Sequence, residues 1–386
     1  MWIDHAIWWH VYPLGFTGAL DGQPGHRLPK IVDWLDYLLE LGANGLQLGP
    51  IFASETHGYD TVDHFRVDPR LGDDADFDKL VAAARERGIH VLLDGVFNHV
   101  GRGFGAPAHW LKGTAFEGHG SLLELDHDQP EVAGHVTRVM NHWLDRGASG
   151  WRLDAAYAVP PRFWRDVLAP VRKAHPEAWF VGEVIHGDYP AYLRESTLDG
   201  ITQYEVWKAI WSSLNDRNLF ELAWAIERHQ DVVAAGTPMT FVGNHDVTRI
   251  ASRLVDERHL AHALVVLFMI GGVPSIYYGD EQAFRGVKEE RAGGDDAIRP
   301  AFPASPDLLS RLGRPVFELH QRLIGIRRRH PWLVRARTEV TELTNTSMRL
   351  TSTDGVNRLV ALLNLDDKPR NFGQYAVKPH DWMIVE

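Results

Sequence analysis

The sequence predicts an α/β protein built on a (β/α)8 TIM barrel, with a short loop insertion after the third strand and a small β domain at the C-terminal end. Two patterns predict the barrel: eight short apolar runs rich in β-branched and aromatic residues, and helical periodicity between them. Strands that are apolar throughout and separated by helices are typical of a parallel sheet buried on both faces. A doubly wound open sheet is the alternative, but no Gly-x-Gly-x-x-Gly motif follows the first run, which favours the barrel.

The predicted strands occupy residues 7–12, 45–48, 90–97, 150–153, 179–184, 201–204, 239–242 and 273–278. Three of the helices between them have recognisable ends. The first spans residues 29–41, with proline near its start and Gly42 after its end. The second spans residues 77–87 and ends before Gly88, and the third begins with a capped turn at residues 128–131 and ends at Gly147.

The alternation of strands and helices breaks after Pro331. Residues 338–351 and 358–364 alternate between apolar and polar positions and are separated by Asp-Gly or Asp-Asp turns, as in antiparallel strands. We therefore predict a barrel over residues 1–332, with the insertion at about residues 100–127, and a β-sandwich-like domain over residues 333–386.

The composition excludes several classes of function. The 386 residues carry a formal net charge of −11, which argues against nucleic acid or an anionic membrane as a partner. Because the chain has no cysteine, it has no thiolate nucleophile and no Cys-ligated metal. Neither a signal peptide nor a bilayer-spanning segment is recognisable. We expect a cytoplasmic protein, as a monomer or a homodimer.

Polar residues close several of the apolar strands. In a barrel of this kind the chemistry takes place at the C-terminal ends of the strands, and charged groups there are costly to bury unless they are paired or used. They end the third, fourth, fifth, seventh and eighth strands: Asp94, Asn98 and His99; Arg152 and Asp154; Glu183; Asn244, His245 and Asp246; Asp280 and Glu281. One such residue would be a salt-bridge partner or a helix cap, but several on one rim indicate an active site.

This set of side chains suits two reaction classes. Retaining glycoside hydrolysis needs one carboxylate to attack the sugar and a second, protonated one to serve the leaving oxygen. A metal-dependent hydrolase needs His and Asp ligands, usually with paired histidines on one strand, whereas His10, His99 and His245 stand singly. The 14 tryptophans also suit a sugar better than a bare metal centre.

At these residues the chain resembles the α-amylase family, glycoside hydrolase family 13. The family's motifs are matched, in their usual order, by Asp94-Gly-Val-Phe-Asn98-His99, Gly150-Trp-Arg152-Leu-Asp154-Ala-Ala156, Gly182-Glu183-Val184 and Phe241-Val-Gly-Asn244-His245-Asp246. Residues 57–60 and 272–281 add further matches, so the resemblance covers roughly residues 8–332.

The resemblance implies Asp154 as the nucleophile, Glu183 as the general acid/base and Asp246 as the acid that stabilises the distorted sugar. Arg152 stands two residues before Asp154, so its charge can keep that carboxylate ionised. Glu183 has to carry a proton at the working pH, so we expect burial and neighbouring carboxylates to raise its pKa.

The same resemblance implies substrate-binding residues. Tyr59 would form the platform beneath the reacting sugar, His99 and His245 would donate to sugar hydroxyls, and Asp94 would orient Arg152. Three tryptophans are candidates for outer subsites, although tryptophan is more often part of a core: Trp110, Trp207 and Trp211.

Two departures from common α-amylases narrow the activity. Those enzymes usually carry Lys-His where this chain has Tyr157-Ala158, and their histidine helps to hold calcium. We therefore expect no metal site, and no cofactor. The loop after the third strand is also short, which leaves little of the separate domain that shapes a long polymer cleft.

Residues 57–63, 122–132 and 182–186 are similar to the neopullulanase and cyclomaltodextrinase branch, which normally carries an N-terminal β domain, whereas this sequence starts at the first strand. The implied function is a retaining α-glucoside hydrolase acting on short, cyclic or branched malto-oligosaccharides, with α-1,4 or also α-1,6 linkages. The nearest picture is a single-barrel hydrolase of a cyclic maltosyl tetrasaccharide, and the expected partner is this small oligosaccharide alone. A transglycosylase with the same catalytic residues and a non-catalytic sugar-binding relative are the alternatives.

Overall fold

Eight parallel strands form the centre of the computed structural model, which describes residues 1–291 and 293–386. The strands are β1 (Trp8–Val11), β2 (Gly45–Leu48), β5 (His90–Gly95), β9 (Gly150–Leu153), β10 (Trp179–Gly182), β11 (Gly200–Ile201), β12 (Met239–Phe241) and β13 (Val273–Tyr277). They pair in the order β11-β10-β9-β5-β2-β1-β13-β12, and a parallel bridge between Thr202 and Met239 joins the two ends of this sheet. The sheet therefore closes on itself, and the predicted barrel is confirmed.

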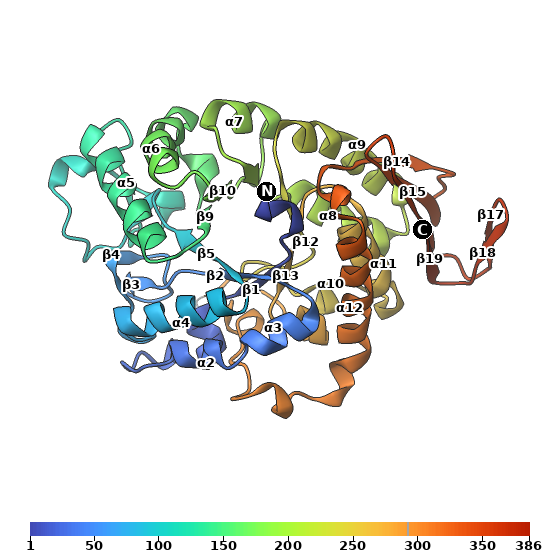
Figure 1. The fold of residues 1–386 in the computed structure, drawn as a ribbon, viewed down its shortest axis with the longest axis horizontal. Helices are drawn as coiled ribbons and strands as arrows, with labels where there is room; N and C mark the ends of the chain where they lie inside the picture. The colour runs from blue at the N-terminus through green and yellow to red at the C-terminus, as the bar shows by residue number, and fades with distance from the viewer. Residues whose placement is uncertain (292) are drawn as a thin grey trace.

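Helices surround the barrel (Figure 1). They are α1 (Pro13–Thr17), α2 (Leu28–Val32), α3 (Leu35–Leu41), α4 (Asp74–Glu86), α5 (Pro130–Asp145), α6 (Pro161–Ala174), α7 (Tyr189–Ser196), α8 (Tyr204–Asp216), α9 (Leu219–Ala235), α10 (Ile250–Arg253), α11 (Leu260–Met269) and α12 (Arg314–Arg329). Most of the long helices bury one face; α5, for example, buries Val132, Val136, Val139 and Trp143 at helical spacing, whereas α11 is buried on nearly all sides. Within the described residues no helix is long and apolar enough to cross a membrane.

The register of the strands places the candidate acids at one height. Asp94 on β5 lies directly opposite Arg152 on β9. Asp154 and Glu183 follow the last residues of β9 and β10, and their backbone N–H groups still donate to carbonyls of the neighbouring strands at 3.0 and 2.8 Å. Parallel pairing therefore brings both carboxylates to the same rim of the barrel.

The predicted helix over residues 29–41 was wrong in one respect, because it is broken into α2 and α3. At the break, the Trp34 side chain is fully buried, with its ring 4.9 Å from that of Phe302 and 6.3 Å from that of Trp9. Placing this large ring in the core takes priority over an unbroken helix. Gly42 ends α3 with a φ of 97°, as the sequence predicts.

Other boundaries also differ from the prediction. The strand predicted at residues 201–204 ends at Ile201, and Tyr204 instead begins α8. The helix predicted at residues 77–87 is α4, which begins at Asp74, and the run at residues 338–351 forms two strands. The third helix begins at Pro130, and no side chain caps it.

Small β elements carry the loops around the barrel. The hairpin of β3 (Phe52–Ser54) and β4 (Thr61–Val67) follows β2. The insertion after β5 forms a three-stranded antiparallel sheet of β6 (His99–Val100), β8 (Leu123–Leu125) and β7 (Leu111–Ala115).

An antiparallel sheet of β14 (Arg337–Thr341), β15 (Ser347–Thr353), β16 (Arg358–Asn364) and β19 (Asp381–Val385) follows the barrel. Leu350 and Leu363 from this sheet join the barrel core, whereas Val360 and Leu362 pack on the hairpin of β17 (Arg370–Phe372) and β18 (Tyr375–Val377). The domain boundary at residue 332 stays a prediction, because the hydrophobic core continues across it.

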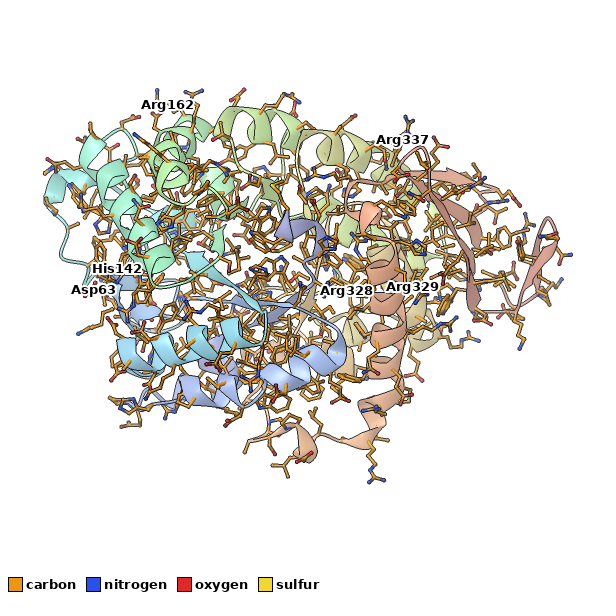
Figure 2. The ribbon with its side chains drawn as sticks, in the orientation of Figure 1. Asp63, His142, Arg162, Arg328, Arg329 and Arg337 are labelled. Carbon is orange, nitrogen blue, oxygen red and sulfur yellow. The ribbon has the colours of Figure 1, made fainter. Side chains whose placement is uncertain are left out.

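The last turn of α12 binds segments near both ends of the chain, and Arg328 and Arg329 mark it in Figure 2. Arg328 donates to the His5 carbonyl and to Asn44 Oδ1, the latter at 2.9 Å. Arg329 pairs with the Glu386 side chain at 2.6 Å.

Candidate active site

A cleft of about 410 Å³ lies at the C-terminal rim of the barrel. Asp154, Glu183 and Asp246, the acids that the sequence singles out, all line it. Its other walls come from the β3–β4 hairpin, the insertion, and the loops that follow β9, β10 and β13. The barrel therefore gathers residues from distant parts of the sequence around one opening.

Arg152 binds three carboxylates at once. Its Nη1 lies 2.8 Å from Asp94 Oδ1 and 2.7 Å from Asp154 Oδ1, and its Nη2 lies 2.7 Å from Glu183 Oε1. All four side chains are buried. Because one buried cation cannot balance three buried carboxylates, the cluster favours retention of a proton on at least one of them.

Burial raises the pKa of each of these three carboxyl groups, although Arg152 acts in the opposite direction. Burial raises the pKa of Asp94 to about 7, and the nearby Asp154 carboxylate adds to the shift. Burial likewise raises the pKa of Asp154 and of Glu183, and the Asp246 carboxylate acts in the same direction on both. The raised pKa of Glu183 is what a general acid needs near neutral pH.

Two neighbouring groups fix the orientation of the Glu183 carboxyl. The backbone N–H of Ala155 donates to its Oε2 at 3.0 Å, and the Tyr204 hydroxyl donates to its Oε1 at 3.0 Å. Ala155 has a φ of 45°, in the left-handed region that L residues rarely adopt. Tyr204 in turn accepts a hydrogen bond of 2.8 Å from Asn244 Nδ2.

Asp246 is held in a different environment. Its Oδ1 accepts from Arg299 Nη2 at 2.9 Å, and its Oδ2 lies 2.9 Å from His245 Nε2. Burial by itself would raise the pKa of Asp246, but His245 and the Arg299 guanidinium outweigh it and hold the pKa well below the usual range. Asp246 therefore stays ionised. Its side chain is 34% exposed and lines the cleft.

The predicted substrate-binding residues form two layers. Tyr59 and His99 line the cleft, whereas Asp94, Arg152 and His245 lie beneath it. The Tyr59 ring stacks parallel to that of His245 at 5.2 Å, and its hydroxyl hydrogen-bonds to His245 Nε2 and to Asp94 Oδ2, the latter at 3.1 Å. These contacts fix the Tyr59 ring as one wall of the cleft.

The two histidines already have protein partners. His99 Nε2 lies 3.1 Å from the Tyr59 carbonyl, and its Nδ1 lies 3.2 Å from Asn98 Nδ2. His245 Nε2 faces Asp246 and the Tyr59 hydroxyl. A sugar hydroxyl would have to replace one of these partners, so donation by His99 and His245 stays a prediction.

Other residues that the sequence singled out lie outside the cleft. Asp280 pairs with Arg249 at 2.9 Å, and Glu281 accepts from the Tyr37 hydroxyl at 2.9 Å, both fully buried. Trp110, in the insertion, donates to Glu131 on α5, and the Trp211 ring packs against the Arg253 guanidinium. Trp207 lines a second groove next to the cleft.

Among the cleft residues that sequence reasoning missed, Tyr204 and Arg299 contact the acids directly. Tyr204 is the last residue of the sixth predicted strand, so the strand-end rule would have found it if it had been applied there. Arg299 lies far beyond β13, in a segment with no periodic pattern, and no sequence signal points to it.

The expected absence of a calcium ion next to Asn98 stays a prediction. Asn98 Oδ1 is buried and has no hydrogen-bond partner among residues 1–291 and 293–386. Over the same residues, neither of the two clusters of three His, Asp or Glu side chains includes a neighbour of Asn98, although calcium also binds carbonyl oxygens. Tyr157, which replaces the usual lysine, donates through its hydroxyl to Glu117 in the insertion at 2.6 Å.

Comparison with protein families matches residues 10–117 and 115–311 to the model described as alpha amylase, catalytic domain. A cyclomaltodextrinase from a Bacillus species is 28% identical, over 85% of this chain and 66% of its own length. Neopullulanase 2 from Thermoactinomyces vulgaris is 29% identical, over 86% of this chain and 64% of its own length. The chain thus spans slightly less than two thirds of the length of these relatives.

Among solved structures, the ligand-free cyclic α-maltosyl-(1→6)-maltose hydrolase from Arthrobacter globiformis superimposes with a TM-score of 0.88. The match covers 100% of this chain and 99% of that chain at 24% identity. At this identity the likeness establishes the fold, including the antiparallel sheet after the barrel.

Proposed function

Because the chain belongs to the α-amylase family of glycoside hydrolases, we propose that it hydrolyses short, cyclic or branched malto-oligosaccharides with retention of the anomeric configuration. One observation carries the proposal. The Asp154 and Glu183 carboxylates share the guanidinium of Arg152, at 2.7 Å each, and line the same cleft as Asp246. A nucleophile and an acid have to flank one anomeric carbon in this way for a double displacement.

In the first step, a carboxylate oxygen of Asp154 attacks the anomeric carbon while Glu183 gives its proton to the leaving oxygen. The product is a covalent glycosyl ester on Asp154. In the second step, Glu183 takes a proton from water, and that water displaces Asp154 from the anomeric carbon. Burial of the Glu183 carboxyl, which raises its pKa, favours the protonated state that begins the cycle.

Asp246 would act on the sugar ring rather than on the leaving group. Its ionised carboxylate, held by Arg299 at 2.9 Å, can accept hydrogen bonds from ring hydroxyls. Such bonds strengthen as positive charge develops at the anomeric carbon, so they stabilise the transition state more than the bound substrate.

The proposed substrate class is taken from the relatives. Two of them, at 28% and 29% identity, are named cyclomaltodextrinase and neopullulanase, and these names indicate which oligosaccharides to test. Linkage preference stays open between α-1,4 and α-1,6. A cytoplasmic location and a monomeric or homodimeric state stay predictions.

The test is to incubate the full chain with maltotriose, maltoheptaose, β-cyclodextrin, pullulan and cyclic maltosyl-maltose and to separate the products by chromatography. We expect the wild type to release glucose and maltose from at least one short or cyclic substrate. We expect the Asp154→Asn variant to release neither sugar. The matched control Asp166→Asn changes an exposed carboxylate on α6 and should leave turnover unchanged. Release of no sugar from any α-glucan by the wild type would overturn the proposal.

A transglycosylase uses the same catalytic residues and differs only in the acceptor. Raising the substrate concentration tests it, because a transglycosylase then forms products longer than the substrate. A non-catalytic relative would bind these sugars without turnover, and the intact set of Asp154, Glu183 and Asp246 argues against it.

A further inference from the structure

A second groove, larger than the catalytic cleft, lies beside it. Its volume is about 770 Å³, against about 410 Å³ for the cleft. Its walls are the segment after β10, over residues 185–190, and the facing sides of α8 and α9. Ile185 and His186, from the family-like segment 182–186, and Trp207 line it, but the function proposed above does not use it.

The groove adjoins the cleft through two shared residues, Ile185 and Tyr204, which line both. The Tyr204 hydroxyl donates to Glu183, so this shared wall is on the side of the general acid. A general acid protonates the leaving oxygen, and the sugars that depart after cleavage therefore lie on its side. The groove is thus placed to continue the binding site for the leaving group.

Aromatic rings border the groove. Trp207, partly buried, lies 5.8 Å from Tyr204 in an edge-to-face contact. Trp224 on α9 is 61% exposed, which is unusual for so large an apolar side chain. The Arg228 guanidinium lies 3.2 Å from the Trp224 ring centroid and orders the ring. Exposed, ordered rings are suited to stacking on the apolar faces of sugars.

Four of the charged residues of the groove are paired with one another. Lys208 forms an ion pair with Glu221, and Arg228 forms one with Glu205. Asp188 and Asp231 also line the groove, so its walls carry more acidic than basic groups. The hydrogen-bonding groups together with the acidic excess favour a neutral, hydroxyl-rich ligand over an anionic one.

We propose that this groove binds the leaving-group end of a linear α-glucan, with Trp224 as the stacking residue that favours longer substrates. The inference rests on the function proposed above and adds to it a preference for chain length. The occupant is a neutral linear malto-oligosaccharide that runs past Ile185 and Tyr204 out of the cleft.

The test compares kcat/KM for maltoheptaose and for maltotriose in Trp224→Ala, Trp224→Tyr and Phe220→Ala. Phe220 is the matched control, because it lies on the same helix, is 49% exposed and lines neither the cleft nor the groove. We expect the maltoheptaose-to-maltotriose ratio to fall about tenfold in Trp224→Ala, to recover largely in Trp224→Tyr and to stay unchanged in Phe220→Ala. Circular dichroism and Tm establish that each variant is folded.

Binding supplies a second readout that does not need turnover. In the Asp154→Asn background, we expect Trp224→Ala to raise the Kd for maltoheptaose, measured by calorimetry, about tenfold. An unchanged ratio and Kd, or an equal loss on both substrates, would overturn the groove proposal. So would a change from dimer to monomer in Trp224→Ala with an unchanged ratio, which would make the groove an interface between copies. If the wild type cleaves neither of these two linear substrates, the binding measurement still decides the groove. The function proposed above fails only if no α-glucan of its own screen is cleaved.

Discussion

The hydroxyl of Tyr204 donates a hydrogen bond of 3.0 Å to Oε1 of Glu183, and it accepts one of 2.8 Å from Asn244. Tyr204 is the first residue of α8, so the start of a helix orients an acid that follows a strand. Burial raises the pKa of Glu183, whereas donors such as Tyr204 favour its ionised form. The working pKa of the acid depends on this balance.

Replacing Tyr204 by Phe tests that balance. The change keeps the ring and removes the donor, so the ionised form of Glu183 loses a partner and its pKa should rise. Because Glu183 has to be protonated in the free enzyme, the alkaline limb of the kcat/KM profile should move to higher pH, by up to about one unit.

The remote variant Tyr375→Phe, on β18, is the control and should leave the pH profile in place. An alkaline limb that stays fixed in Tyr204→Phe, or that moves to lower pH, would contradict the role assigned to Tyr204.

Replacing Glu183 by Gln should lower turnover of malto-oligosaccharides by about 10²- to 10⁴-fold, the range that general acid catalysis supplies. With a substrate whose leaving group needs no proton, such as α-glucosyl fluoride, the rate of the first step in Glu183→Gln should fall much less. Asp154→Asn should remove turnover of both substrates, because it removes the nucleophile. Wild-type rates of malto-oligosaccharide turnover in either variant, with native circular dichroism, would disprove the assignment.

The stereochemistry follows from the same pair of residues. A retaining enzyme holds its two carboxyl groups about 5–5.5 Å apart, whereas an inverting enzyme needs about 6.5–9.5 Å to admit a water. Asp154 and Glu183 end adjacent strands and bind one guanidinium, which supports the shorter distance. We expect time-resolved NMR to detect the α-anomer first; a β-anomer first would exclude double displacement.

Chelation should have little effect. Tyr157-Ala158 replaces the usual Lys-His pair, and neither of the two clusters of three His, Asp or Glu side chains in residues 1–291 and 293–386 lies at Asn98. We expect EDTA to leave both kcat/KM and Tm largely unchanged. A large loss that calcium restores would mean that Asn98 and its neighbours do hold an ion.

The sequence was sufficient to predict which residues meet at the rim of the barrel. Asp154, Glu183 and Asp246 each follow an apolar strand, and in a closed parallel barrel the ends of successive strands come together at one face. The raised pKa of Glu183 was also predictable, because a carboxyl group at the end of a buried strand lies close to other carboxylates.

Local boundaries were less predictable, because tertiary packing overrode the local pattern. The helix over residues 29–41 breaks so that Trp34 can pack against Phe302, a residue far away in the sequence. Periodicity carries no information about such a contact.

The sequence by itself determined the barrel, the order of the family motifs and the identities of the acids at the rim, because apolar runs and strand-end carboxylates are local patterns. Only the tertiary structure decided which side chains tune those acids. Arg299 contacts Asp246 from a segment after the last barrel strand, and Trp224 on α9 borders a groove that α8 and the segment after β10 complete. The positions of Arg299 and Trp224 depend on how segments far apart in the sequence pack together. Neither the spacing nor the periodicity of residues along the chain encodes that packing.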